Sequence, residues 1–161
     1  MVWLVFFRLS PRPFHSWRNL LLRIFGAKIG NHVHVYPSVR VWAPWNLAIG
    51  NFVGIGDGVK VYSMDKISIG DYAVVSQGSH LCAGSHDYNS KNFQLVTAPI
   101  NIGARVWLCT ETFVSPGVEI AEGSVIAPRG LVGKTITESW CVWGGVPAIK
   151  IGTRNKEQVL G

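Results

Sequence analysis

Charged residues are scarce in this sequence, and acidic ones are the scarcest. Only 15% of the 161 residues are charged, and nine Asp and Glu stand against fifteen Lys and Arg, which gives a net charge of +6. This surplus of positive charge favours an anionic partner, such as a phosphorylated cofactor or a membrane surface. The basic residues do not interleave with aromatic ones in any single segment, so we do not expect nucleic acid as a partner.

Paired cysteines and long apolar runs are lacking as well. Cys82, Cys109 and Cys141 form no CxxC pair and leave one cysteine over, which is typical of a protein in a reducing compartment. The apolar run of residues 1–7 is too short to span a membrane, and it has no cleavage site of a secretory signal. We therefore expect a cytoplasmic protein, either free or at the inner face of the membrane.

What the sequence does contain is a six-residue repeat. Fifteen times an Ile, Leu or Val heads a six-residue unit, and in eleven of these units Ser, Thr, Ala or Val follows four positions later. This period fits neither a helix nor a simple strand, and it is typical of a parallel β-helix whose coil is a triangle of three short strands. We therefore predict a single all-β domain of about five coils. The unit heads are Ile29, Val35, Val41, Ile49, Ile55, Val61, Ile69, Val75, Leu81, Ile102, Leu108, Val114, Ile120, Ile126 and Val132.

Three segments are expected along the chain. Residues 1–28 do not fit the repeat and should form an N-terminal helical cap, residues 29–137 the β-helix, and residues 138–161 a turn-rich C-terminal tail. An excursion loop over residues 87–101 interrupts the β-helix. A long loop in a compact fold is more often functional than accidental, so this loop marks where a site is expected.

The N-terminal segment carries an apolar helical face with basic residues beside it. One interpretation is a cap that covers the open end of the β-helix, since an uncovered edge would promote aggregation. The other is a basic amphipathic helix that lies on a membrane. We favour the cap, and the two roles can coexist. The apolar face comprises Phe14, Trp17, Leu20, Leu21, Ile24 and Phe25, flanked by Arg18, Arg23 and Lys28.

A histidine stands immediately before the excursion loop. The packed interior of a triangular column leaves no room for a ligand, and the register puts His86 on an outer corner. There it can act as a general base near neutral pH, with Asp87 orienting its ring; the alternative is a surface histidine without a role. Ser85 is expected to point into the core. The corner row of His86 comprises Asn46, Lys66, His86, Glu119 and Thr137.

Two further features bear on the chemistry. Two more rows are expected on the other corners, one of His34, Gly54, Val74, Trp107 and Val125 and one of Arg40, Lys60, His80, Phe113 and Leu131. On its row Trp107 either packs in the core or an interface, or stacks on a ligand. His80 and His86 have the spacing of a metal pair, but the register puts them on different corners of the column. Since zinc needs three or four converging ligands, we expect no metal site within one subunit.

Short motifs around these residues resemble those of the hexapeptide-repeat O-acetyltransferases. The resemblance extends from about Leu9 to Arg154. The segments that carry it are Gly-Ser-His-Asp-Tyr at 84–88, Val-Trp at 106–107, Phe-Val-Ser-Pro-Gly-Val at 113–118 and Val-Pro-Ala-Ile at 146–149. The run Val-Trp-Ala-Pro-Trp-Asn-Leu at 41–47 is similar to one branch, the polysaccharide acetyltransferases of the colanic-acid type.

The resemblance implies a left-handed β-helix and a homotrimer with active sites between subunits. It further implies acetyl-CoA as the donor. His86 matches the family's catalytic histidine, which deprotonates the acceptor hydroxyl, and Trp107 matches a tryptophan that lines the site from a neighbouring chain. The residues implied to hold CoA are Ala127, Arg129 and Lys134 of the upper coils and Pro147, Lys150 and Arg154 of the tail.

The sequence departs from the family pattern at a few positions. Val146 replaces the usual Asn of the tail, and Ala121 replaces a Gly of the last coil. Pro128 removes one backbone N–H donor. Related sugar acetyltransferases also use an Asn near the histidine, where the nearest candidates here are Asp57 and Gly58.

The prediction is an acetyl-CoA-dependent O-acetyltransferase that acts on a sugar of a cell-surface polysaccharide or of its precursor. Two alternatives stay open. One is a non-catalytic trimeric scaffold or an inactive relative. The other is a zinc carbonic anhydrase on the same fold, which needs three histidines that converge across a subunit interface.

Overall fold

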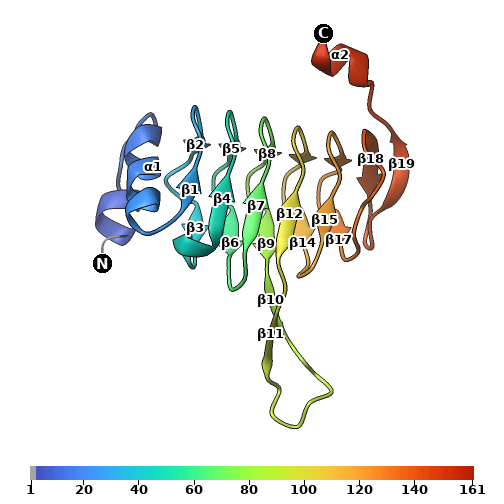
Figure 1. Cartoon of the computed structure of the whole chain (residues 1–161), viewed down its shortest axis with the longest axis horizontal. Coiled ribbons are helices and arrows are strands. Elements are labelled where there is room, and N and C mark those ends of the chain that lie inside the picture. Colours follow the sequence, from blue (N-terminus) through green and yellow to red (C-terminus); the bar gives the residue numbers. More distant parts are fainter. Residues whose placement is uncertain (1–2) are drawn as a thin grey trace.

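The computed structural model describes residues 3–161, so Met1 and Val2, the start of the predicted cap, lie outside it. The chain winds into a three-sided column with a helical cap at one end, the C-terminus at the other and an arm that projects from the middle (Figure 1). The predicted parallel β-helix is thereby confirmed.

Each side of the column is a sheet of parallel strands, one short strand per coil, to which the second sheet adds the antiparallel strand β19 (Ile149–Thr153). The first sheet contains β1 (Lys28–Ile29), β4 (Leu47–Ile49), β7 (Ile67–Ile69), β12 (Ile100–Ile102) and β15 (Glu119–Ile120). The second contains β2 (His34–Val35), β5 (Gly54–Ile55), β8 (Val74–Val75), β13 (Trp107–Leu108), β16 (Val125–Ile126), β18 (Cys141–Gly144) and β19 (Ile149–Thr153). The third contains β3 (Arg40–Val41), β6 (Lys60–Tyr62), β9 (His80–Cys82), β14 (Phe113–Val114) and β17 (Leu131–Val132).

The repeated aliphatic residues form the interior of the column. Thirteen of the fifteen unit heads are buried, and only Ile29 and Val41 of the first coil are half-buried. Alternate residues of a strand point to opposite faces, so the residue before each head faces outward. Burial of aliphatic side chains at about 25 cal/mol per Å² is the main force that holds such a column together.

The column has about six turns, one more than the sequence predicted. β18 continues the second sheet in parallel to β16, with Val142 opposite Val125 and Trp143 opposite Ile126. The repeat is lost there because β19 turns back and pairs antiparallel with β18. The pairing with β19 closes the hydrogen-bonding edge of β18, so no further coil stacks on it.

Two of the three predicted rows are correct and the third is wrong. The row of His34, Gly54, Val74 and Trp107 and the row of Arg40, Lys60, His80 and Phe113 pair as expected, although they lie on strand faces and not at corners. The third row is Lys28, Ala48, Ser68, Asn101 and Glu119. Each of the first two coils contains two residues more than the eighteen of a regular coil, at the start of β4 and of β7. These insertions move Ala48 and Ser68 into the positions expected for Asn46 and Lys66.

The excursion is an ordered hairpin arm and starts earlier than expected. β10 (Gly84–His86) pairs antiparallel with β11 (Leu95–Thr97), and the chain rejoins the first sheet at Ile100. The arm leaves the column at the corner between the third and the first sheet (Figure 1). Ser85 is therefore exposed, and its predicted place in the core is wrong.

The cap consists of the short π-helix η1 (Trp3–Arg8) and the helix α1 (His15–Ile24), which lie across the first coil. The N–H groups of each coil donate to the next coil, as His34 does to Val53, so the first coil is left with unpaired carbonyls. Arg18 donates to the Val35 carbonyl at 2.6 Å, and Asn19 donates to the Val33 carbonyl at 2.7 Å. The predicted capping role is thus visible in hydrogen bonds to an open sheet edge.

Two short helices complete the chain, the 3-10 helix η2 (Pro44–Asn46) and the C-terminal helix α2 (Lys156–Leu160). None of the helices within residues 3–161 is long and apolar enough to cross a bilayer.

Candidate active site

His86 lies at the end of β10, on the arm and not on a corner of the column. Its exposed ring stacks on the Phe93 ring with centroids 4.8 Å apart and an interplanar angle of 9°. Its Nδ1 lies 2.7 Å from the Phe93 carbonyl. A carbonyl only accepts, so Nδ1 carries the proton and Nε2 of the neutral ring keeps a free lone pair.

Asp87 does not take the orienting role that the sequence suggested. Its carboxylate accepts from the Asn89 backbone N–H at 2.9 Å, and its backbone N–H donates to the Gln94 carbonyl at 2.9 Å. Asp87 thus shapes the turn of the arm. The group that fixes the His86 ring is Phe93, which the sequence analysis did not identify, because its contact depends on the hairpin pairing.

Trp107 stands on the outer face of the second sheet. Its side chain is 45% exposed, so it is not a core residue of this chain. Its indole N–H donates to the Ser76 hydroxyl one coil below at 2.9 Å. This bond holds the ring against the sheet and leaves part of its apolar surface available for a partner.

One chain does not bring His86 and Trp107 together. The arm leaves at the corner between the third and the first sheet, whereas Trp107 lies on the second sheet, the side opposite that corner. Figure 1 shows the arm pointing away from the column. Any site that uses both side chains therefore needs a second copy of the chain.

A hollow of about 410 Å³ lies below Trp107 on the second sheet. Gly54 leaves room there because it adds no side chain to the outer face.

Asp57 is the charged residue of this hollow. It accepts a hydrogen bond from the Ser38 hydroxyl at 2.6 Å and forms an ion pair with Arg12. The Ser38 hydroxyl and the Arg12 guanidinium hold the pKa of Asp57 below its usual value. The carboxylate therefore stays ionised and can accept hydrogen bonds from hydroxyl groups. The full lining is Arg12, Tyr36, Gly54, Ile55, Gly56, Asp57, Val74, Val75, Ser76 and Gln77.

A second hollow of about 420 Å³ lies at the C-terminal end of the column. It brings together Lys134 and Pro147, two residues that the family resemblance implied in CoA binding. Trp143 lines it too, and its buried Nε1–H has no acceptor within the described part of the chain. A buried donor without a partner is costly, so this indole fits a ligand that supplies an acceptor. Trp143 could not be predicted from the sequence, because its segment no longer follows the six-residue repeat and was expected to be a tail.

The other implied cations are engaged by the protein itself. Arg129 donates to Glu111 at 2.6 Å, and Lys150 pairs with Glu138, a contact that raises the lysine pKa. Arg154 donates to the Arg105 carbonyl at 2.7 Å and to the Gly123 carbonyl at 3.1 Å. Arg129 and Lys150 are solvent-exposed pairs that can exchange for a phosphate, whereas Arg154 fixes the tail to the column.

Ala127 lies at the end of β16. Its backbone N–H donates to the Trp143 carbonyl at 2.7 Å, and a side chain on Gly144 would meet its Cβ. The small side chain therefore allows β18 to approach closely. Separately, residues 3–161 contain no group of three His, Cys, Asp or Glu that could hold a metal ion.

Comparison with known proteins shows the family. A protein of Escherichia coli strain K12, named as the colanic acid biosynthesis acetyltransferase WcaF, is 43% identical over 148 residues. The match covers 92% of this chain and 81% of that relative. This chain belongs to the WcaF family of hexapeptide-repeat acetyltransferases. It is therefore an acetyltransferase, as the sequence motifs predicted.

Two solved structures share the fold of this WcaF-family chain. A hexapeptide-repeat acetyltransferase of Vibrio cholerae O1 biovar eltor, complexed with acetyl coenzyme A, is 22% identical with a TM-score of 0.84, over 93% of this chain and 82% of that chain. A galactoside acetyltransferase in complex with coenzyme A is 24% identical with a TM-score of 0.81, over 98% of this chain and 80% of that chain. At this identity they establish the fold alone. No protein-family model matches the sequence.

Proposed function

We propose that this chain transfers the acetyl group of acetyl-CoA to a hydroxyl of a sugar in a cell-surface polysaccharide or its precursor, with His86 as the general base. The observation that carries the proposal is the hydrogen bond of His86 Nδ1–H to the Phe93 carbonyl, which makes Nε2 the nitrogen with the free lone pair in the neutral ring. An oriented neutral imidazole is the side chain best suited to remove a proton near neutral pH. The name of the 43% identical relative supports the substrate class.

The chemistry assigned to His86 is a proton transfer in two directions. Nε2 accepts the proton of the sugar hydroxyl while the oxygen attacks the thioester carbonyl carbon. When the carbon–sulfur bond breaks, the imidazolium returns this proton to the departing thiolate. The Phe93 carbonyl stabilises the imidazolium between these steps, since it accepts from Nδ1–H throughout.

We infer that the working unit is a homotrimer in which the arm of one subunit meets the second sheet of its neighbour. This arrangement would place His86 above Trp107 and above the hollow lined by Asp57. The support is topological, because His86 and Trp107 lie on opposite sides of one column. The ionised Asp57 and the neighbouring Gln77 and Tyr36 are groups that bind sugar hydroxyls, so this hollow is the proposed acceptor site.

For the donor, we assign the hollow at the C-terminal end of the column. Lys134 would attract a phosphate, Trp143 Nε1–H would donate to an acceptor of the bound molecule, and Pro147 would form part of the wall. Ala127, Arg129 and Lys150 belong to the same end and complete the proposed CoA-binding set, with Arg154 holding the tail in place. Support comes from the two solved relatives that carry acetyl-CoA or CoA. With three free cysteines, the cytoplasm is the proposed location.

The test is the variant His86→Ala, with Tyr88→Ala as a control on the same arm, where the tyrosine is 81% exposed. Acetyl transfer to polysaccharide fragments should fall about 10²–10⁴-fold in His86→Ala, while acetyl-CoA affinity measured by calorimetry stays unchanged. The control should keep wild-type activity. Undiminished transfer by His86→Ala would refute the general-base assignment, and a wild-type protein that does not bind acetyl-CoA would refute the enzyme proposal itself.

A further inference from the structure

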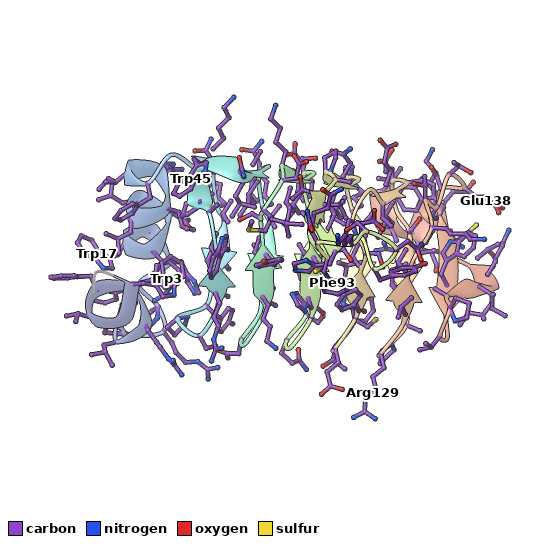
Figure 2. All side chains as sticks on the ribbon, turned by 90° about the horizontal axis from the view of Figure 1, so that it is seen from below. Trp3, Trp17, Trp45, Phe93, Arg129 and Glu138 are labelled. Carbon is purple, nitrogen blue, oxygen red and sulfur yellow. The ribbon has the colours of Figure 1, made fainter. Side chains whose placement is uncertain are left out.

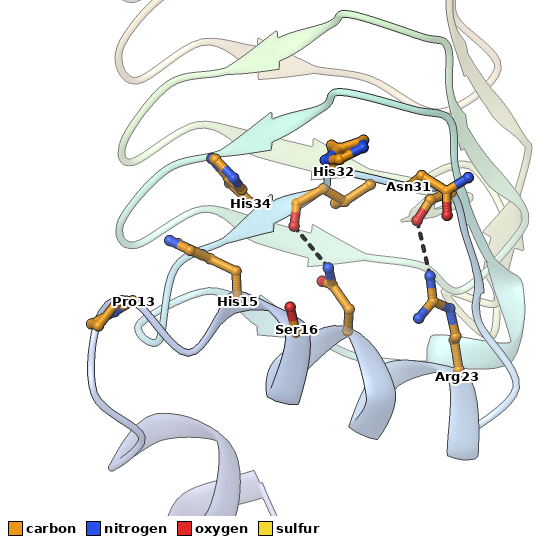
Figure 3. Close-up of a pocket in the computed structure, with 10 residues that line it drawn as sticks. Pro13, His15, Ser16, Arg23, Asn31, His32 and His34 are labelled. Carbon is orange, nitrogen blue, oxygen red and sulfur yellow. Dashed lines mark hydrogen bonds between the residues drawn. The ribbon is translucent and has the colours of Figure 1, made fainter.

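Helices on the surface of most water-soluble proteins face the core with their apolar side, but the cap helix α1 faces the column with polar residues. Its inner face presents the polar side chains Arg18 and Asn19 to the first coil, together with Leu21 and Leu22. Asn19 donates to the Val33 carbonyl, and Figure 3 shows Arg23 reaching from the helix to the first coil, where it donates to the Gly30 carbonyl. These polar contacts are needed because the open edge offers carbonyl oxygens. The consequence is that most of the apolar residues of the helix face outward.

The outward apolar residues of α1 continue onto η1 and form one surface, which we call the outer cap face. Five of the six residues that the sequence placed on the apolar helix face are exposed, and Leu21 alone is buried, so the helix caps the column mainly with its other side. Figure 2 shows Trp17 at the tip of the molecule and Trp3 between cap and column. The outer cap face comprises Val5, Phe6, Leu9, Phe14, Trp17, Leu20, Ile24 and Phe25.

The outer cap face is held in a fixed shape. The Trp17 indole N–H donates to the Phe6 carbonyl at 2.8 Å, which joins α1 to η1. Behind this surface Trp3 stacks on Phe7 at 3.9 Å, and Phe7 is fully buried. Between the two helices lies a mostly apolar groove of about 350 Å³. A large, preformed apolar surface on a water-soluble protein marks a site of interaction.

The positive charge of the N-terminal third of the chain favours an anionic partner for the outer cap face. Residues 1–56 contain six Lys and Arg and no Asp or Glu, whereas residues 57–161 contain nine of each. The whole net charge of +6 therefore belongs to the N-terminal third of the chain. Arg8, Arg23 and Lys28 are exposed in or beside the cap. An apolar surface rich in Phe, Trp and Leu with a cationic surround matches the interface of an anionic bilayer.

We propose that the outer cap face docks on a membrane surface that contains anionic phospholipids, with the column standing away from the bilayer. The surface lies at the very end of the column, so docking leaves the arm and the second sheet free (Figure 1). Phe14, Trp17 and Ile24 enter the boundary between headgroups and acyl chains, and the basic residues contact lipid phosphates. This inference concerns a surface separate from the proposed active site and does not depend on it.

Vesicle flotation tests the proposal with two lipid mixtures, phosphatidylcholine alone and an equimolar mixture with phosphatidylglycerol. The wild-type protein should float with the anionic vesicles, bind neutral ones much more weakly, and lose binding at high salt. The double variant Leu9→Gln, Ile24→Gln removes two side chains that are 74% and 67% exposed, so the core is untouched. Its partition onto anionic vesicles should fall at least about tenfold.

Two further variants sharpen the result. Leu160→Gln changes an exposed leucine of α2 at the opposite end of the column and should float like the wild type. Arg8→Gln should weaken binding to anionic vesicles about fivefold and leave neutral binding unchanged. Circular dichroism and thermal melting check that each variant is folded, and acetyl transfer to a soluble acceptor should be the same in all of them.

Three outcomes would overturn the proposal. The first is a wild-type protein that stays unbound in the presence of anionic vesicles. The second is a double variant that floats as well as the wild type. The third is a wild-type protein that does not float but sediments as a larger particle than the double variant, which would make the outer cap face a contact between copies of the chain.

Discussion

The His86 imidazole stacks on the Phe93 ring, and its Nδ1 donates to the carbonyl of that same residue at 2.7 Å. Both contacts come from one residue on the opposite side of the arm. Together they fix the plane of the imidazole and the tautomer, and Nε2 stays free for the acceptor hydroxyl. Phe93 is therefore a positioning residue in the proposed reaction.

Replacing Phe93 by Ala should loosen the imidazole without unfolding the protein. The backbone carbonyl remains, but the stacking contact, worth about 1 kcal/mol for an aromatic pair, is lost. We expect kcat to fall about tenfold with an unchanged KM for acetyl-CoA. Tyr88→Ala is the control for a general disturbance of the arm. An unchanged kcat and pH profile for Phe93→Ala would show that the stacking does not position His86.

Mixing two inactive variants tests whether the active site is shared between subunits. His86→Ala and Trp107→Ala should each show greatly reduced activity when expressed alone. In a trimer that contains both kinds of chain, about one site in three combines an intact His86 with an intact Trp107. Co-expression with two different affinity tags, followed by purification on both, should restore a corresponding part of the activity.

Two outcomes would contradict a site shared between subunits. If mixed oligomers are isolated and stay as inactive as the single variants, His86 and Trp107 do not act across an interface. If light scattering finds only monomers of the wild type, the shared site is refuted directly.

Lys134 and Lys150 should differ in their effects on acetyl-CoA binding. Lys134 lines the C-terminal hollow and pairs with no acid in residues 3–161, whereas Lys150 is already paired with Glu138. We expect Lys134→Gln to raise the KM for acetyl-CoA about tenfold, as for the loss of one charged hydrogen bond, and Lys150→Gln to raise it less. Trp143→Phe should also raise the KM, because it removes the unpaired indole N–H. Equal KM values in Lys134→Gln and the wild type would argue against this hollow as the donor site.

Arg18 should be the residue of the cap on which stability depends most. It is fully buried and donates to the carbonyls of Val35, Pro11 and Arg12 at 2.6, 2.8 and 2.5 Å. Arg18→Met keeps much of the volume but leaves these carbonyls without their donor. We expect the free energy of unfolding to drop by about 3 kcal/mol and the Tm to fall by roughly 10 °C in calorimetry.

The exposed Arg8 provides the matched control for that experiment. Arg8→Met should leave the Tm within about 1 °C of the wild type, because surface substitutions away from special contacts have small effects. A Tm for Arg18→Met close to that of Arg8→Met would mean that solvent satisfies the carbonyls of the first coil.

Much of the column could be predicted because the six-residue repeat of aliphatic residues can be recognised within a short stretch of sequence. A unit head such as Leu108 or Ile126 is buried wherever the chain turns every six residues, and the period is readable without knowledge of neighbours. The row of Trp107 followed from the same count. The row of His86 did not, because two inserted residues in each early coil put Ala48 and Ser68 where Asn46 and Lys66 were expected, and because the chain leaves the column at Gly84, before it reaches His86. The sixth turn could not be predicted, because residues 138–144 no longer follow the six-residue repeat although β18 pairs with β16.

The sequence alone determined that this chain forms a β-helix of the acetyltransferase type, with His86 beside an insertion and an apolar, basic N-terminal segment. Only the tertiary structure decided that the insertion is an arm on which Phe93 holds the imidazole, and that this arm lies opposite Trp107. It also decided that α1 turns its apolar side outward. The physical reason is that these features depend on backbone carbonyls, such as those of Val35 and Phe93, that accept hydrogen bonds from distant side chains. Their positions are set only when the coils and the hairpin have formed.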